Sequence, residues 1–179
     1  MSSPRRARAS AALAVCMVLV SAVAQAREPA PDVSAWSNWL GRFHPALIHF
    51  PIALLLVAVV AEALCVVRRD GRYADAARFM VTAAAWISIP AAATGFFRAD
   101  SLTFTASEQH LFAIHRIAGI ATPVLIFLCA GLSAGVRRSG QIWELWLYRG
   151  LLVIAAAAAV VAGHYGGEIV FGSGFFPLW

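Results

Sequence analysis

Four long runs of apolar residues follow one another along the chain, and short polar stretches separate them. The runs cover about 45–67, 76–97, 111–134 and 145–170. A helix rises about 1.5 Å per residue, so roughly 20 residues cross the hydrocarbon core of a bilayer, and each run is near or above that length. The pattern therefore predicts an all-α integral membrane protein, built as a bundle of four transmembrane helices.

The composition excludes a soluble fold. The chain has 179 residues, of which 61% are hydrophobic and 13% are charged. Soluble domains average about 25% charged residues. All 14 basic residues are arginines, and they give a net charge of +5. In a membrane protein such an excess reports topology, and it does not indicate a nucleic-acid-binding surface.

The first 26 residues have the features of a secretory signal peptide. Three arginines lie within residues 1–10, an apolar stretch covers 11–23, and residues 24–26 read "AQA". Together these features predict cleavage after Ala26. Residues 27–44 then form a periplasmic or interfacial segment, and residues 45–179 form the transmembrane domain. The alternative, a retained fifth helix, is disfavoured because the apolar stretch is short for a span.

Arginines in the two short turns predict the orientation of the bundle. Arg68, Arg69 and Arg72 lie between the first two helices, and Arg137 and Arg138 lie between the last two. Cytoplasmic loops of membrane proteins carry such an excess of basic residues. Both mature termini then face the periplasm, which agrees with the signal peptide. The protein is expected in the bacterial inner membrane with an N-out, C-out topology.

All five histidines fall on the predicted periplasmic side, although they come from three different helices. His44 and His49 lie at the start of the first helix, His110 and His115 at the start of the third, and His164 near the end of the fourth. The five-residue spacing that recurs in the first and third helices suggests an internal repeat. Ionisable residues inside a membrane are candidates for functional sites.

Imidazoles from separate helices at one depth are the arrangement that holds a haem between helices. His49 and His115 lie roughly 6–7 Å into their spans, and His164 lies at a comparable level. Neutral imidazole is a good axial ligand for haem iron, and the flat macrocycle needs a slot between helices. The sequence therefore predicts a b-type haem with axial ligands chosen from His49, His115 and His164.

Neighbouring residues extend this candidate site. Gly119 lies one turn deeper than His115 on the same face and would line the slot. Arg116 could pair with a haem propionate, or it could extend to the membrane surface. Four further residues are predicted to surround the ligands without binding the iron: His44, Glu168, Gly166 and Gly167.

Two other interpretations of the histidines stay open. His49, His115 and His164 could form a copper or zinc site without haem, with Glu168 as a further ligand. Alternatively, the histidines only hydrogen-bond between helices, and the protein is a structural or assembly subunit that binds no cofactor. No nucleotide-binding or nucleophile motif appears, so an electron-transfer or accessory protein is expected rather than a stand-alone enzyme.

Two features lie away from the histidines. Glu62 lies deep in the first helix and is predicted to hydrogen-bond a neighbouring helix. Trp143, Trp146 and Tyr148 are predicted to mark the cytoplasmic membrane interface of the fourth helix, because such aromatic side chains favour the headgroup level.

Three motifs resemble a known family. The stretches "FHPALIHFP" (43–51), "IHRIAG" (114–119) and "GHYGGEIVFGSG" (163–174) resemble the bacterial membrane family called domain of unknown function 2231. The resemblance implies a four-helix membrane protein. Members occur beside redox modules, which implies a cytochrome c, a Rieske protein or a quinone as the partner in or on the bilayer. Phe171 stands where the family usually has tyrosine.

Overall fold

The computed structural model describes residues 35–172 and 174, and the predicted signal peptide lies outside these residues. Every regular element of residues 35–172 is a helix, and four helices are long and apolar enough to cross a membrane. The elements are α2 (Ala35–Gly41), α3 (His44–Arg68), α4 (Gly71–Asp100), α5 (Ala106–Ser139) and α6 (Ile142–Phe171). The predicted all-α fold with four membrane-length helices is confirmed.

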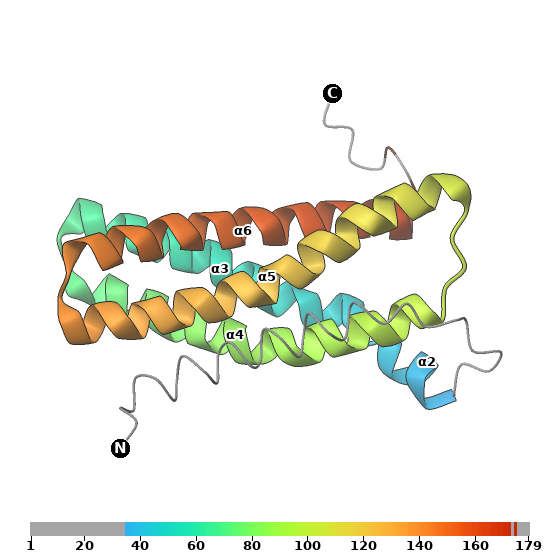
Figure 1. Cartoon of the computed structure of the whole chain (residues 1–179), viewed down its shortest axis with the longest axis horizontal. Helices are drawn as coiled ribbons and strands as arrows, with labels where there is room; N and C mark the ends of the chain where they lie inside the picture. The colour runs from blue at the N-terminus through green and yellow to red at the C-terminus, as the bar shows by residue number, and fades with distance from the viewer. Residues whose placement is uncertain (1–34, 173, 175–179) are drawn as a thin grey trace, which may run out of the picture.

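The four long helices form two hairpins, α3–α4 and α5–α6, which pack side by side (Figure 1). The tight turns of both hairpins lie at one end of the bundle, while α2 and loop 101–105 lie at the other (Figure 1). Contacts are most extensive within each hairpin, and the hairpins meet along two seams, α4–α5 and α3–α6. All four helices extend beyond the predicted spans.

The two tight turns are built in the same way. Arg69 ends α3 and Gly140 ends α5, each in the left-handed backbone conformation with φ of 54° and 65°. The next residue in each turn is extended and precedes the following helix. Asp70 caps α4, because its carboxylate accepts a hydrogen bond from the Arg72 backbone N–H at 2.9 Å. The Arg72 guanidinium also binds this carboxylate and lowers the pKa of Asp70.

Helix α5 begins earlier than the hydrophobic pattern predicts. The Glu108 carboxylate accepts a hydrogen bond from the Thr105 backbone N–H at 2.8 Å, and the Glu108 N–H donates back to the Thr105 hydroxyl. This capping box starts the helix at Ala106, whereas the apolar run began near residue 111. His110 therefore lies within α5 and not in the polar stretch before it.

The boundaries of the helices reveal an internal repeat with an offset of 71 residues. Adding 71 to the bounds of α3 gives residues 115–139, the last part of α5, and adding it to those of α4 gives the bounds of α6. Helix α2 begins at Ala35 and corresponds to the start of α5 at Ala106. The predicted repeat was thus present, but its register was wrong: His44 corresponds to His115 and not to His110.

The core of the bundle follows the same repeat. Five pairs of equivalent residues are at most 1% exposed, and they line the contact between the hairpins: Leu55 with Ile126, Ala58 with Cys129, Ala77 with Tyr148, Val81 with Leu152, and Ala84 with Ala155. Small side chains predominate, which lets helix backbones approach closely in a membrane. The repeat matches α3 with α5 and α4 with α6, so the α4–α5 seam corresponds to the α3–α6 seam. The two hairpins are therefore related to each other like the subunits of a two-fold symmetric dimer.

A buried ion pair joins the two hairpins near the end with the tight turns. The Arg149 Nε–H donates to the Glu62 carboxylate at 2.9 Å, and the two side chains are 15% and 6% exposed. The predicted hydrogen bond of Glu62 to a neighbouring helix is thereby confirmed. Tyr148 is buried rather than interfacial, because its ring fills the core at the position equivalent to Ala77, whereas Trp143 and Trp146 are exposed as expected.

Removing one partner of this pair should destabilise the bundle strongly. Glu62→Ala leaves the Arg149 guanidinium buried without its carboxylate, and such a loss costs about 3–5 kcal/mol. We expect a large fall in the thermal midpoint of the purified protein in detergent micelles, and a smaller fall for Glu62→Ala/Arg149→Ala. Arg72→Ala, which removes an exposed partner of Asp70, is the control and should change the midpoint little. Equal effects of the single and the double variant would contradict the buried pair.

Candidate functional site

His44 reaches from the first residue of α3 to the backbone of α4. Its Nδ1 lies 2.9 Å from the carbonyl oxygen of Ala91, which also accepts a hydrogen bond from the Thr94 hydroxyl at 3.0 Å. A carbonyl oxygen only accepts hydrogen bonds, so the His44 Nδ1 carries the proton. In the neutral form of this imidazole the lone pair is therefore on Nε2.

His115 makes the equivalent contact in the second hairpin. Its Nδ1–H donates to the carbonyl oxygen of Ala162 in α6 at 2.8 Å. In both hairpins the histidine precedes the carbonyl residue by 47 positions. The same reasoning gives neutral His115 the same tautomer, with the lone pair on Nε2.

A glycine next to each accepting carbonyl makes room for the imidazole. A carbonyl in a helix points toward the residue four positions later, and that residue is Gly95 after Ala91 and Gly166 after Ala162. A Cβ atom on Gly95 would lie 2.8 Å from the His44 ring, and one on Gly166 would lie 3.0 Å from the His115 ring. Any other residue would obstruct the ring, so the histidine, the carbonyl and the glycine form one unit.

The two imidazoles meet between the hairpins. Their ring centroids are 6.2 Å apart and their planes are inclined by 80°. Both side chains are half-buried, and within the described residues neither Nε2 has a hydrogen-bond partner. The bundle thus brings together two imidazoles whose Nδ1 atoms are bound by helix carbonyls, one from each half of the repeat.

A cavity of about 820 Å³ lies against this histidine pair, mainly between α4 and α5. Gly95 and Gly119 contribute small surfaces to its lining, whereas Arg116 and Asp100 contribute charged ones. A Cβ on Gly119 would meet nothing within 4 Å, so the cavity is open beside this residue. The buried hydroxyl of Thr122, which also lines the cavity, donates to its own helix at the Ala118 carbonyl.

The structure brings some of the predicted site residues together and leaves others apart. His115, Gly119 and Arg116 line the cavity, and Gly166 lies against the His115 ring. His44, predicted to surround the ligands without binding the iron, faces His115. His49 is exposed, and its Nδ1 contacts the Pro45 carbonyl of its own helix.

The remaining predicted residues lie elsewhere on α6. The ring of His164 packs edge-on against Tyr165, with centroids 5.2 Å apart. The buried Glu168 carboxylate accepts a hydrogen bond from the Gly174 N–H at 2.6 Å, and Gly167 is half-buried. Among residues 35–172 and 174, no three His, Cys, Asp or Glu side chains form a group that could hold a metal ion. The structure therefore does not assemble His49, His115 and His164 into one site.

Sequence reasoning missed Gly95 and the carbonyls of Ala91 and Ala162. A signal for them was present, because the spacing from His44 to Ala91 and Gly95 recurs from His115 to Ala162 and Gly166. Comparing the chain with itself at an offset of 71 residues reveals this pattern, whereas the spacing between neighbouring histidines does not.

The glycines beside the imidazoles should not tolerate a methyl group. Gly95→Ala places a Cβ 2.8 Å from the His44 ring and Gly166→Ala places one 3.0 Å from the His115 ring. Overpacking of this kind costs about 1–3 kcal/mol, against a gain of about 1 kcal/mol from the helix preference of alanine. Gly119→Ala is the matched control: its Cβ meets no neighbour, and alanine favours a helix over glycine by about 1 kcal/mol. We expect lower thermal midpoints in detergent for the first two variants and an unchanged or higher midpoint for the third. The same response from all three would contradict the ring contacts.

Comparison with known proteins agrees with the observed fold. The model of the family described as "predicted membrane protein (DUF2231)" matches residues 42–175, which include all four long helices and both histidines of the central pair. No curated protein and no solved structure gives a significant match. Because the family model covers well over half of the chain, the protein belongs to the DUF2231 family of predicted membrane proteins.

Proposed function

We propose that this protein is a membrane-embedded electron carrier that binds a b-type haem with His44 and His115 as the two axial ligands. The observation that supports this proposal is the pair of imidazoles from different hairpins, each with its Nδ1–H held by a helix carbonyl and its Nε2 unused. Histidines that bind metals commonly donate their other ring N–H to such an acceptor.

The spacing of the rings suits one metal centre between them. Their centroids are 6.2 Å apart, so both imidazoles could hold one metal ion between them. His44 thus takes the place that sequence reasoning gave to His49 or His164.

The adjoining cavity has the size and lining that a haem requires. Its volume of about 820 Å³ lies within the roughly 300–1,000 Å³ of cofactor sites. Gly119 leaves space beside His115, and Arg116 supplies a positive charge for a propionate. Bound haem would supply one-electron redox chemistry, while the helix carbonyls of Ala91 and Ala162 hold the ligand rings in one orientation.

The site belongs at the periplasmic side of the bacterial inner membrane in this proposal. The histidines lie at the opposite end of the bundle from the two tight turns, and those turns carry the arginines that favour the cytoplasm. Both termini would then be periplasmic. A partner that exchanges electrons with the site would be a periplasmic cytochrome c, a Rieske protein or a quinone in the bilayer.

An absorption spectrum tests the haem proposal. Protein purified in detergent from haem-replete cells should show a Soret band, and reduction with dithionite should produce sharp α and β bands. His44→Ala and His115→Ala should lose most of the bound haem. His49→Ala and His164→Ala are the matched controls and should retain it, because these residues lie outside the pair.

Other outcomes of this experiment have definite meanings. A featureless visible spectrum at full protein yield would exclude haem, and metal analysis would then test the copper or zinc alternative. Loss of haem from His49→Ala with retention in His44→Ala would support the ligands predicted from the sequence. Full-length protein with neither haem nor metal would favour a structural subunit.

The orientation of the bundle can be tested separately with cysteines in its two ends. Thr103 and Gln141 are exposed, and they lie in the loop before α5 and in the turn before α6. In a chain whose native cysteines are replaced, a membrane-impermeant maleimide added to spheroplasts should label Thr103→Cys and not Gln141→Cys. Labelling of Gln141→Cys alone would reverse the topology.

A further inference from the structure

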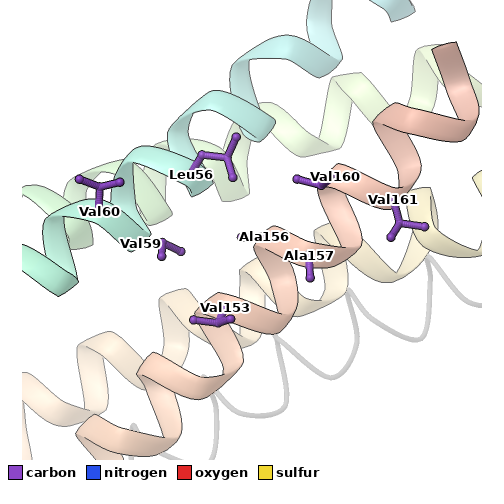
Figure 2. Close-up of a pocket in the computed structure, with 8 residues that line it drawn as sticks. All are labelled: Leu56, Val59, Val60, Val153, Ala156, Ala157, Val160 and Val161. Atoms are coloured by element: carbon purple, nitrogen blue, oxygen red, sulfur yellow. The ribbon is translucent and has the colours of Figure 1, made fainter. Parts of the chain in front are cut away.

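A groove of about 540 Å³ lies between α3 and α6, along one of the two seams where the hairpins meet (Figure 2). All of its lining residues are aliphatic, and they come from these two helices alone: Leu56, Val59, Val60, Val153, Ala156, Ala157, Val160 and Val161. The groove lies at the middle of the bundle, since Leu56 is central in α3 and Ala157 is close to the centre of α6.

The repeat identifies the side chains at the equivalent positions of the other seam. In the other seam, between α4 and α5, the residues equivalent to Ala157 and Leu56 are Trp86 and Phe127. Their rings pack edge to face, with centroids 6.2 Å apart and planes inclined by 81°. The α4–α5 seam thus has two aromatic side chains in contact at these positions, with Trp86 at its outer surface, whereas the α3–α6 seam has an alanine and a leucine.

We propose that the groove between α3 and α6 binds one acyl chain of a membrane phospholipid, which supplies the apolar volume that Trp86 and Phe127 supply in the other seam. Both helices have the length and composition of membrane spans, so the middle of the bundle lies in the hydrocarbon layer. Acyl chains are the apolar groups present at that depth.

The shape and the lining of the groove favour a single chain over a helix. The α6 residues 153–161 extend about 12 Å along the axis, a path that suits an extended alkyl chain. Valine side chains from both α3 and α6 line the groove, whereas membrane helices associate through small residues at their surfaces. The absence of polar side chains from the lining excludes a headgroup site.

Spin-labelled phosphatidylcholine, with the label near the end of the acyl chain, tests this site in reconstituted vesicles. The variant Leu56→Phe/Ala157→Trp transfers the aromatic pair of the other seam into the groove. Relative to the wild type, we expect it to lower the motionally restricted lipid by about one per protein. Ala134→Trp is the control: it adds a ring at an exposed position of α5 outside the groove and should leave this number unchanged.

A second measurement tests the lipid site without relying on the folding of the double variant. Phospholipid added to the detergent-purified protein should raise the thermal midpoint of the wild type, because a ligand that binds only the folded state stabilises it. The smaller replacement Ala157→Leu, which narrows the groove, should reduce this increase even if the double variant fails to fold. The control Ala134→Leu should leave this increase unchanged.

Two results would overturn the proposal. One is an equal number of restricted lipids in the wild type and in the folded variant that fills the groove. The other is a protein occupant: cross-linking through α3 or α6 to a second copy, which disappears in the variant while the number of restricted lipids stays the same.

Discussion

An imidazole N–H that enters a helix bundle in a membrane has only protein groups to accept its hydrogen bond, and this constraint organises the end of the bundle that holds the histidines. Helix carbonyls can accept a second hydrogen bond, but the side chain four residues later usually blocks the approach. Glycine at 95 and at 166 removes that obstacle and lets His44 and His115 reach the backbone of the next helix. The two side chains then have fixed tautomers and adjacent positions.

Buried charged groups at the other end of the bundle also need protein partners. The Glu62 carboxylate and the Arg149 guanidinium are both shielded from solvent, and each supplies the partner that water would otherwise provide. Because one residue comes from each hairpin, the ion pair also fixes how the hairpins register against each other. The ion pair therefore joins the hairpins near one end of the bundle. At the other end, the hydrogen bonds of His44 and His115 lie within each hairpin, and the two rings meet between the hairpins.

The sequence predicted the helices well because apolar runs of membrane length have few alternative structures. It failed where a short polar signal outweighed hydropathy: Thr105 and Glu108 start α5 at Ala106, within the polar stretch between the second and third apolar runs. The candidate site was harder, because the hydrophobic pattern gives only an approximate depth along a helix and no rotation about its axis. His49 lies five residues, about 7.5 Å, further along α3 than His44, and only His44 faces His115.

The 71-residue repeat gives the chain a freedom that a symmetric dimer of two-helix hairpins lacks. Identical subunits must place the same side chain at both equivalent positions. An ion pair across their two-fold interface therefore occurs twice or not at all. Here one chain has Glu62 in the first half and Ser133 at the equivalent position of the second, while Arg78 and Arg149 occupy equivalent positions in both. Covalent linkage has thus allowed the halves to diverge into a single ion pair at one end, while the histidine units at the other end stay alike.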